Sequence, residues 1–299
     1  MLALARQRWI FLGTAVSFIS TSFFLPRLSG NVEMLIAAAV ILFLGVPHGA
    51  LDVLYLRKVL LVRSASKVAA LLFLYLSVAT GVVALWLFSP LVFLISFLIA
   101  SGFHFSGDPE EGSHFLTRCS IGAGVIVLPS LLYRSELTNL YSLLTNSVVA
   151  DIVVKISVPG AYLVIGLSMV AVVSELLKEH YMTAAELVTA VLLATFVSPL
   201  LAFTIYFCLM HSARHILRTG ELVSMSTKAF LLECALPMVA VFIATAIAWS
   251  QKNNLRLDAS IIRIVFVMLA ALTAPHMLIV EPVRFGGWQK PRPSDMTTQ

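Results

Sequence analysis

Charged residues are scarce in this sequence. Lysine, arginine, aspartate and glutamate make up 12% of its 299 residues, whereas about 25% is usual for a soluble domain. Hydrophobic residues make up 60%, and the mean hydropathy is +0.97. So little charge argues against a soluble domain and indicates that a lipid bilayer surrounds most of the chain.

Several patterns that mark other protein classes are also missing. The three cysteines form no CxxC pair and lie apart in or beside apolar runs, so we interpret them as buried free thiols. The net charge is +5, but the basic residues are not clustered with aromatic ones, which argues against nucleic-acid binding. No internal repeat is present. We therefore expect a single integral membrane domain over residues 1–299, with a polar tail at 289–299.

Apolar runs of helical length follow one another along the whole chain. A spanning helix needs about 20 mainly apolar residues. We predict nine such segments, at residues 9–25, 34–60, 67–88, 90–106, 119–133, 158–177, 184–217, 229–249 and 260–283. The segment at 184–217 would rise about 50 Å as one helix, and it contains Pro199, so it is either kinked or divided in two. The predicted fold is an all-α, polytopic bundle of eight to ten spanning helices.

Basic residues between the apolar runs indicate the orientation. Arg6 and Arg8 precede the first run, which resembles a signal peptide but lacks an A-x-A-like cleavage site, so we expect it to be retained. Four basic residues lie between positions 57 and 67, and the positive-inside rule places them in the cytoplasm together with the N-terminus. Further basic groups at 214–228 and 252–263 cannot all lie on that side if there are nine simple crossings.

Five of the seven histidines lie inside or at the ends of apolar segments, close to other polar residues. They occur in four motifs: GVPHGALD with His48 and Asp52, HFSGD with His104 and Asp108, HSARH with His211 and His215, and TAPHMLIVE with His276 and Glu281. Ionisable side chains in a bilayer cost about 2.5–3.5 kcal/mol each on insertion scales, so they tend to face the bundle interior and to serve a function. His114 and His180 lie among charged residues, and we expect them in loops outside the site.

The spacing within the motifs indicates a metal site in the core of the bundle. Residues four apart lie on one face of an α-helix. His211 and His215 can therefore direct two imidazoles at one ion, as paired ligands do in HExxH zinc proteins. The carboxylates of the first two motifs have the same spacing from their histidines if the helix continues through Gly49 and Gly107. Each could then bind a metal or orient its neighbouring imidazole.

Other interpretations remain open from the residues alone. A proton relay or ion path also uses histidine and aspartate in membranes, and a single buried histidine is often a hydrogen-bonded packing residue. Paired imidazoles favour a metal, and a cysteine-free site with four imidazoles suits redox-active iron, although zinc is the alternative. A substrate that reaches such a site should itself be apolar. We interpret most of the arginines in or near the ends of apolar segments (Arg57, Arg214, Arg218 and Arg284) as anchors that reach toward the membrane surface.

The four motifs, in this order, resemble the landmarks of the Brp/Blh family of bacterial and archaeal membrane proteins. The resemblance extends from Gly45 to Glu281 and departs from the usual pattern at Ser106, where a glycine is more common. It implies a β-carotene 15,15'-dioxygenase that uses iron(II) and O2 to split β-carotene into two molecules of all-trans-retinal. It also implies four iron-binding histidines, which are His48, His104, His211 and His215.

The resemblance leaves other polar residues without an assigned role. Asp52, Asp108, His276 and Glu281 either support the four histidines or complete a second metal site. The expected location is the cell membrane of a prokaryote, with β-carotene, O2 and lipid as partners. Two alternatives stay open: a membrane protein that binds carotenoid or retinal without catalysis, and a proton-coupled transporter that uses the same histidines and aspartates.

Overall fold

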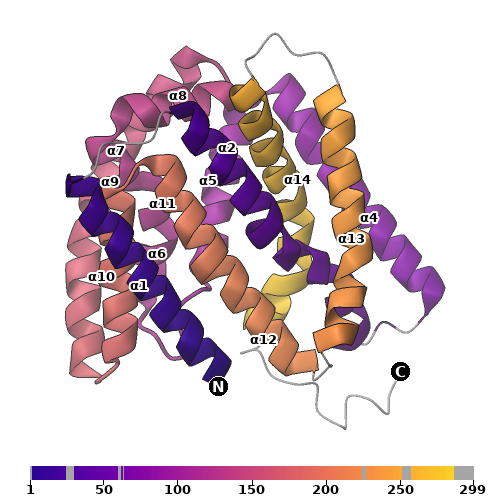
Figure 1. The fold of residues 1–299 in the computed structure, drawn as a ribbon, viewed down its shortest axis with the longest axis horizontal. Helices are drawn as coiled ribbons and strands as arrows, with labels where there is room; N and C mark the ends of the chain where they lie inside the picture. Colours follow the sequence, from indigo (N-terminus) through magenta and orange to yellow (C-terminus); the bar gives the residue numbers. More distant parts are fainter. Residues whose placement is uncertain are drawn as a thin grey trace.

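The computed structural model of the chain is a bundle of helices (Figure 1). It describes residues 2–24, 30–59, 62, 64–223, 227–250 and 257–285, and every regular element in these ranges is helical. The tail predicted at 289–299 lies outside the described residues. Seven of the described helices are long and apolar enough to cross a membrane, and two shorter apolar helices accompany them. The expected all-α architecture with several spanning helices is confirmed.

The first half of the chain alternates long helices with short irregular turns. Its elements are α1 (Leu2–Phe24), α2 (Gly30–Val40), the π-helical η1 (Ile41–Gly45), the 3₁₀-helical η2 (Val46–Leu51), α3 (Asp52–Leu54), the π-helical η3 (Tyr55–Val59), α4 (Ala65–Phe88), α5 (Pro90–Phe105), α6 (Phe115–Val127) and α7 (Pro129–Leu132). The first motif thus lies in a stretch where α-, π- and 3₁₀-helical turns follow one another.

The second half contains the remaining long helices. Its elements are α8 (Arg134–Leu144), α9 (Ser147–Leu177), α10 (Tyr181–Phe196), α11 (Pro199–Ile205), the π-helical η4 (Tyr206–Ser212), α12 (Ala213–Val223), α13 (Thr227–Ser250) and α14 (Leu257–Phe285). Helix α9 begins eleven residues before the segment predicted at 158–177, because Asn146 caps its first turn by accepting a hydrogen bond from the backbone N–H of Val149.

The overlong segment predicted at 184–217 divides into two helical segments, of which the second, Pro199–Val223, is long and apolar enough to cross a membrane. Helix α10 ends at Phe196, and the next residue, Val197, has an extended backbone with ψ of 149°. Pro199 then occupies the start of α11, where its missing N–H costs no helical hydrogen bond. The chain reverses at this break and returns through α11, η4 and α12. The proline therefore starts a new helix instead of kinking an old one.

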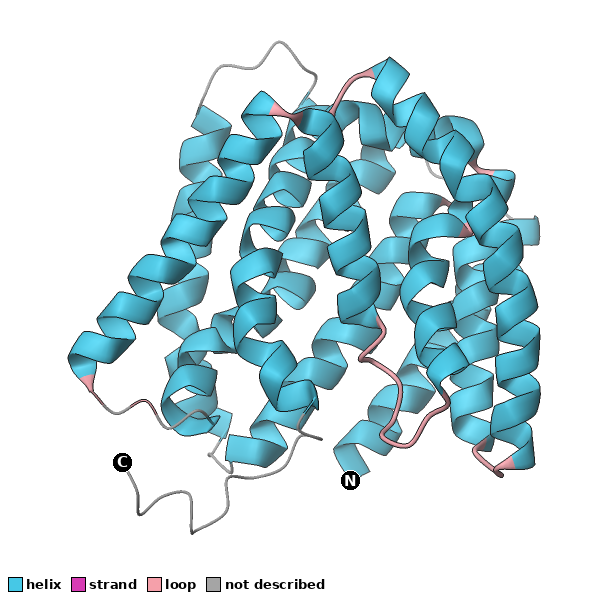
Figure 2. Ribbon diagram, turned by 180° about the vertical axis from the view of Figure 1, so that it is seen from behind, coloured by secondary structure: helices cyan, strands magenta, loops and turns pink. Residues whose placement is uncertain are grey.

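This division determines where the basic residues lie. The beginnings of α1, α4 and α13 and the end of α12 are found at one end of the bundle, whereas the end of α13 and the beginning of α14 lie at the other (Figures 1 and 2). The basic residues of α1, α12 and the start of α4 therefore share one end. Most of the group at 252–263 lies outside the described residues.

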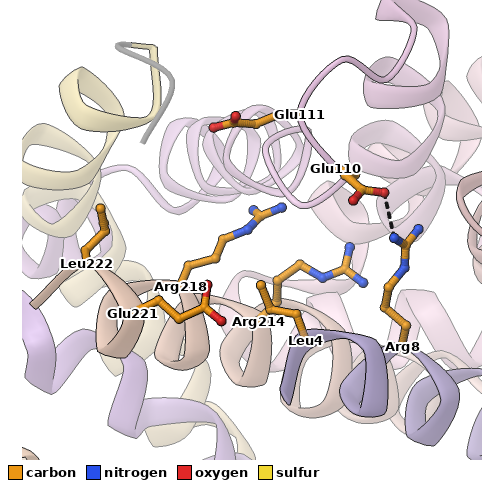
Figure 3. A pocket seen from close by; sticks show the side chains of 8 residues that line it. All are labelled: Leu4, Arg8, Glu110, Glu111, Arg214, Arg218, Glu221 and Leu222. Atoms are coloured by element: carbon orange, nitrogen blue, oxygen red, sulfur yellow. Dashed lines mark hydrogen bonds and ion pairs between the residues drawn. The ribbon is translucent and has the colours of Figure 1, made fainter. Parts of the chain in front are cut away.

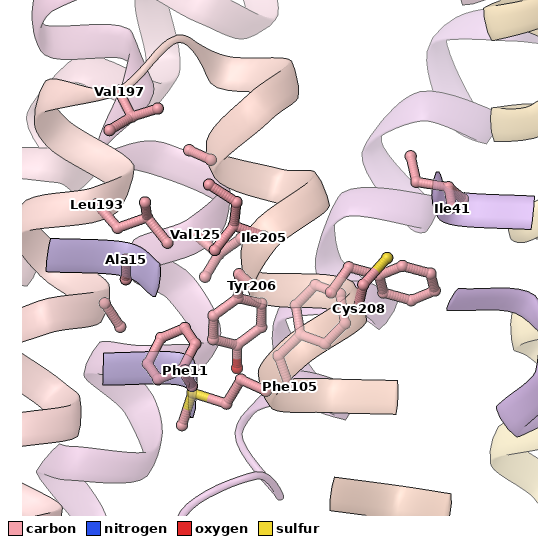
Figure 4. Close-up of a cluster of buried hydrophobic side chains, with 14 of the residues drawn as sticks. Phe11, Ala15, Ile41, Phe105, Val125, Leu193, Val197, Ile205, Tyr206 and Cys208 are labelled. Carbon is pink, nitrogen blue, oxygen red and sulfur yellow. The ribbon is translucent and has the colours of Figure 1, made fainter. Parts of the chain in front are cut away.

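The helices differ in how much of their surface is buried. Helices α4 and α13 expose apolar side chains such as Phe73 and Leu236 along most of their length, as expected for lipid-facing helices. The span formed by α11, η4 and α12 is the most buried. Around it, the largest apolar cluster joins side chains of α1, α5, α6 and α10, including Phe11, Phe105 and Tyr206 (Figure 4). The polar motifs lie on these central segments.

The predicted free thiols are largely as expected. All three cysteines are free; Cys208 and Cys234 are buried, whereas Cys119 is only half-buried. Helix α1 extends the first predicted segment toward the N-terminus, and its buried residues Phe11 and Ala15, four apart, face α10 and η4. It is not among the seven long apolar candidates.

Candidate metal centre

All five motif histidines meet in one cluster at the core of the bundle. The His48 ring lies 5.0 Å from the ring of His211, 5.8 Å from His215 and 5.1 Å from His276, measured between centroids. The His104 ring lies 4.7 Å from His211 and 5.1 Å from His276. All five side chains are buried. The cluster thus contains the four predicted ligands and also His276, whose role the sequence left open.

Two of the histidines come from turns that depart from α-helical geometry. His48 lies in the 3₁₀-helical η2, directly after the π-helical η1, and His211 lies in the π-helical η4. Pro47 contributes to the irregularity, because it cannot donate a hydrogen bond to the preceding turn. Single π-helical turns within α-helices occur often at functional sites, where they change the direction of the side chains that follow.

Gly45 allows the segment that carries His48 to approach the segment that carries His211. A Cβ atom added at Gly45 would overlap the ring of Phe207 and lie 3.5 Å from the Sγ atom of Cys208. Phe207 in turn stacks on His211, with centroids 5.6 Å apart and planes at 16°, and meets His48 edge-on at 5.4 Å. The glycine of the first motif is therefore required for close packing around the histidines.

Three of the histidines are each held by a carboxylate at Nδ1. An ionised carboxylate can only accept a hydrogen bond, so the Nδ1–H donates and Nε2 carries the lone pair. Each pair joins segments more than 100 positions apart in the sequence. The pairs are His104 with Glu281 (2.8 Å), His211 with Asp108 (2.9 Å) and His276 with Asp52 (2.6 Å).

His48 adopts the same tautomer by a different contact. Its Nδ1 atom lies 2.6 Å from the carbonyl oxygen of Gly45, which can only accept, and 3.0 Å from Oγ of Ser212. Ligand atoms of His48, His104 and His276 lie within 4.8 Å of one another. The Nε2 atoms of His104, His211 and His276 are buried and have no hydrogen-bond partner among the described residues. Buried lone pairs without donors are unusual, and this donor set fits a metal ion bound by neutral imidazoles.

The predicted pairing within the first two motifs is wrong. Asp52 contacts His276 instead of His48, and Asp108 contacts His211 instead of His104. A 3₁₀-helix has three residues per turn, so residues four apart in η2 point about 120° away from each other. In the second motif α5 ends at Phe105, and the following turn carries Asp108 off the helix. Both conditions for helical i,i+4 geometry therefore fail.

Asp108 is the most thoroughly connected of the three carboxylates. The Tyr206 hydroxyl donates to its Oδ2 atom at 2.6 Å, and Nη1 of Arg214 donates to its backbone carbonyl at 2.8 Å. Burial alone would raise the pKa of Asp108, but the neighbouring His211, the Tyr206 hydroxyl and the Arg214 guanidinium together hold this pKa below its usual value. The carboxylate is therefore kept ionised beside His211.

Arg214 belongs to a buried ion pair that sequence reasoning missed. Its guanidinium pairs with Glu186, whose side chain is fully buried, and its Nε atom donates to Oε1 of Gln7 at 3.2 Å. Arg8 also binds Glu186, at 3.0 Å. The signal for this pair was present in the sequence: Glu186 is a carboxylate within an apolar run that needs a partner of opposite charge.

The interpretation of most of Arg57, Arg214, Arg218 and Arg284 as membrane-surface anchors is wrong for Arg214 and Arg284. Arg214 is buried, and Arg284 donates to the carbonyl oxygen of His104 at 2.8 Å and pairs with Glu281 at 2.5 Å. Arg218, which is half-buried, donates to the carbonyl oxygens of residues 107–109 at 3.1–3.2 Å. The arginines thus hold the turn that carries Asp108 and the end of the helix that carries His104.

A polar cavity of about 420 Å³ lies beside this turn (Figure 3). Arg8, Arg214 and Arg218 line it together with Glu110 and other residues, and Arg8 pairs with Glu110 at 2.6 Å. The cavity lies at the end of the bundle where α1 begins and α12 ends. Through Arg214 it reaches the backbone of the residue that holds His211.

The other residues around the cluster are aromatic or lie apart. Tyr55 is buried and stacks on His215, with centroids 5.7 Å apart. His114 caps the start of α6, and His180 pairs with Glu175 at 2.9 Å. These two histidines therefore lie outside the cluster. Both contact the carboxylate of Glu175, His114 through its backbone N–H and His180 through its ring.

Comparison with known proteins identifies the family. The family described as beta-carotene 15,15'-dioxygenase matches residues 39–283, which contain the whole cluster. The chain belongs to this family. It is 30% identical over 259 residues to the beta-carotene 15,15'-dioxygenase of uncultured marine bacterium 66A03, which covers 82% of this chain and 92% of the relative.

A second relative agrees with this assignment. The probable beta-carotene 15,15'-dioxygenase Blh of Halobacterium salinarum (strain ATCC 700922 / JCM 11081 / NRC-1) is 28% identical over 311 residues, covering 89% of this chain and 86% of the relative. No solved structure matches the chain. The resemblance of the four motifs to the Brp/Blh family is confirmed.

Proposed function

We propose that this protein is an iron-dependent oxygenase that cleaves β-carotene at its central 15,15' double bond into two molecules of all-trans-retinal. The observation that supports this most strongly is the cluster of five buried imidazoles, in which the orphaned Nε2 atoms of three lie at the centre of the bundle. The relatives named for this reaction cover most of the chain.

The proposed iron ligands are the four histidines that the resemblance implied, together with His276. These four predicted ligands are His48, His104, His211 and His215. His276 is added because its ligand atom lies within 4.8 Å of those of His48 and His104. Neutral imidazoles and the absence of thiolates suit iron(II). When bound, iron supplies the redox chemistry that allows O2 to react with the polyene double bond.

The chain's own residues prepare the site for the metal. The carboxylates of Asp52, Asp108 and Glu281 hold one nitrogen of an imidazole and leave the other for the metal. Such partners fix the ring orientation and raise the basicity of the ligand. Because each carboxylate already binds a histidine, the contacts favour this supporting role over a second metal site. The rings of Phe105 and Phe207 pack against His211 and exclude water from that side.

The proposed location is the cell membrane of a prokaryote, with the N-terminus in the cytoplasm. The end of the bundle where α1 begins carries Arg8 and Arg218, as well as the acidic turn at 110–111. The positive-inside rule counts lysine and arginine and gives little weight to acidic residues, so these arginines support the cytoplasmic placement of this end. Protease digestion of a short tag at the N-terminus should occur only in inverted vesicles; digestion in right-side-out cells would reverse the orientation.

Expression in cells that make β-carotene tests the proposed activity. The protein should bleach the orange pigment and accumulate retinal, and His211→Ala should abolish both effects. His180→Ala is the matched control, because His180 is outside the cluster, and it should retain activity. A carotenoid-binding protein without catalysis would leave the colour and retain pigment on purification. A transporter would leave the colour and retain none.

Metal analysis tests the ligand set separately from activity. Purified protein should contain one iron per chain, and alanine at any of the four predicted ligands should remove it. His276→Ala should weaken iron binding, measured by competition with a chelator, while His180→Ala should not. Iron binding unchanged in His276→Ala would reduce the ligand set to the four predicted ligands. Two irons per chain, halved by Asp52→Asn, would replace the proposal with a dinuclear site.

A further inference from the structure

Two apolar cavities lie on opposite sides of the contact between α5 and α6. The inner one, of about 70 Å³, is enclosed by α5, α6, α8, α11 and α14, and none of its described lining residues is charged. The outer one, of about 760 Å³, is a groove between α5, α6 and α9. Its walls include the exposed apolar residues Ile99, Phe115 and Ile156, which face the lipid side of the bundle.

At one position along the contact between α5 and α6, the two cavities are separated by side chains and not by backbone. Leu98 of α5 and Ile126 of α6 line both the inner cavity and the outer groove. Nearby, Gly102 and Gly122 let the two helices touch: a Cβ atom at Gly122 would overlap the carbonyl oxygen of Gly102. The backbones are therefore fixed by this contact, whereas Leu98 and Ile126 can change rotamer without moving a helix.

Two residues that line the inner cavity, Ser101 and Phe203, link it to the histidine cluster. Ser101 lines the cavity and lies three residues before His104 on the same buried face of α5, which is about 4.5 Å along the helix. Phe203 also lines it and stacks on Phe207, with centroids 5.2 Å apart and planes at 11°. Phe207 stacks on His211 at 5.6 Å. A column of aromatic rings thus connects the cavity to an imidazole of the site.

We propose that Leu98 and Ile126 form a gate through which an extended apolar polyene passes from the membrane to the histidine cluster. The identity of the polyene, β-carotene entering or retinal leaving, rests on the proposed function. A hydrocarbon of this kind partitions into the bilayer, so it reaches the protein through a lipid-facing opening. Six of the eight residues that line the polar cavity are arginines or glutamates, so a hydrocarbon that entered there would have to displace water from charged groups.

The chain contains a natural reporter for this route. The indole N–H of Trp86 donates to the carbonyl oxygen of Leu144 at 2.8 Å, and Leu144 lines the inner cavity. The other three tryptophans, Trp9, Trp249 and Trp288, can be replaced by phenylalanine. In this variant, with Trp86 as its single tryptophan, prepared without metal in detergent, all-trans-retinal should quench Trp86 fluorescence by energy transfer as it passes the gate and widens the inner cavity, which at about 70 Å³ is smaller than retinal itself.

Bulk at the gate should slow this entry. In Leu98→Phe/Ile126→Phe, the rate of quenching by retinal should fall about tenfold, the change that about 1.4 kcal/mol of added barrier produces. Leu91→Phe is the matched control, because Leu91 is an exposed residue of the same helix outside both linings described above. It should bind at the original rate, and Leu98→Ala/Ile126→Ala should bind at least as fast. Equal rates in the gate and control variants would overturn the proposal.

A second measurement covers the case in which the phenylalanine variant does not fold. Leu98→Cys, in a protein whose native cysteines are replaced by alanine, can be modified after purification with thiol reagents of increasing size. The rate of quenching should fall as the reagent grows. A rate independent of reagent size would also overturn the gate.

The two proposals can fail separately. Retinal entry is measured without iron, so the gate stands if the entry rates change as expected but no β-carotene is cleaved. Conversely, cleavage with an unchanged KM for β-carotene in Leu98→Phe/Ile126→Phe would overturn the gate and leave the oxygenase.

Discussion

Replacing Asp108 by asparagine keeps the size of the side chain but removes its charge and one of its acceptor atoms. In the structure the carboxylate accepts two hydrogen bonds, from Nδ1 of His211 at 2.9 Å and from the Tyr206 hydroxyl at 2.6 Å. An asparagine offers one acceptor oxygen and one NH2 donor. If its oxygen accepts from Nδ1–H of His211, its NH2 group can donate to the Tyr206 hydroxyl, which can also accept; in the reverse orientation the NH2 group faces Nδ1–H of His211. The Nδ1–H of His211 therefore loses either its partner or the charge that strengthens it.

The size of the effect follows from this geometry. Loss of the carboxylate behind a histidine ligand typically costs about 10–100-fold in metal affinity, which corresponds to about 1.4–2.7 kcal/mol. In the orientation in which the NH2 group faces Nδ1–H of His211, the unpaired buried donor would also cost about 1–3 kcal/mol of folding stability. We therefore expect Asp108→Asn to bind iron about 10–100-fold more weakly and to cleave β-carotene correspondingly less well at limiting iron.

Chelator competition measures this affinity directly. Asp151→Asn is the matched control, because Asp151 is half-exposed on α9, where it pairs with Lys155 at 2.6 Å, and it should bind iron like the wild type. Tyr206→Phe removes only the second hydrogen bond and should have a smaller effect than Asp108→Asn. If Asp108→Asn retains wild-type iron affinity while His211→Ala loses iron, the carboxylate does not act on the metal through His211, and this reasoning is refuted.

Two further substitutions test the packing around the cluster. Gly45→Ala should lower the free energy of unfolding by about 1–3 kcal/mol through overpacking and should reduce the iron content. Gly49→Ala is the control, because Gly49 has open space around it, and it should change neither quantity. Thermal unfolding and metal analysis measure the two quantities, and equal effects of both substitutions would contradict the close-packing argument. Glu186→Gln leaves the buried Arg214 without its counter-charge and should lower the free energy of unfolding by about 3–5 kcal/mol. Glu110→Gln is the control at an exposed position and should lower it by less than about 1 kcal/mol. If thermal unfolding shows no larger loss of stability for Glu186→Gln than for Glu110→Gln, the buried pair does not stabilise the fold.

The sequence predicted which histidines would gather in the core of the bundle because burial makes their chemistry conspicuous. Five histidines in apolar segments carry a cost that a chain retains only where they are used or paired. Their convergence required no knowledge of the fold beyond the expectation that such residues face inward. His276 followed from the same argument, although its motif offered no second imidazole to suggest a ligand role.

The pairing of the carboxylates could not be predicted in this way. Each histidine–carboxylate contact joins distant segments, and only the packed structure determines which segments meet. The local rule used for Asp52 and Asp108 assumed an uninterrupted α-helix, and the π- and 3₁₀-helical turns around them break that assumption. No pattern in the sequence marks such turns, apart from the proline before His48. The ion pair between Glu186 and Arg214 was not predicted for the same reason. Each residue stands out in its own apolar segment, but its partner lies on another helix.

The position of His211 explains why the centre lies where it does. One nitrogen of its ring faces Asp108, whose backbone is bound by an arginine that lines the polar cavity. The face of the same ring stacks on Phe207, which begins the aromatic column toward the apolar cavity. The histidine thus lies at the boundary between a charged environment that can hold a metal's ligands in one tautomer and an apolar one that can receive a hydrocarbon. A reaction between a metal-dependent oxidant and a polyene needs both environments beside the metal ligands. Here the π-helical turn η4 places the single imidazole of His211 in contact with both.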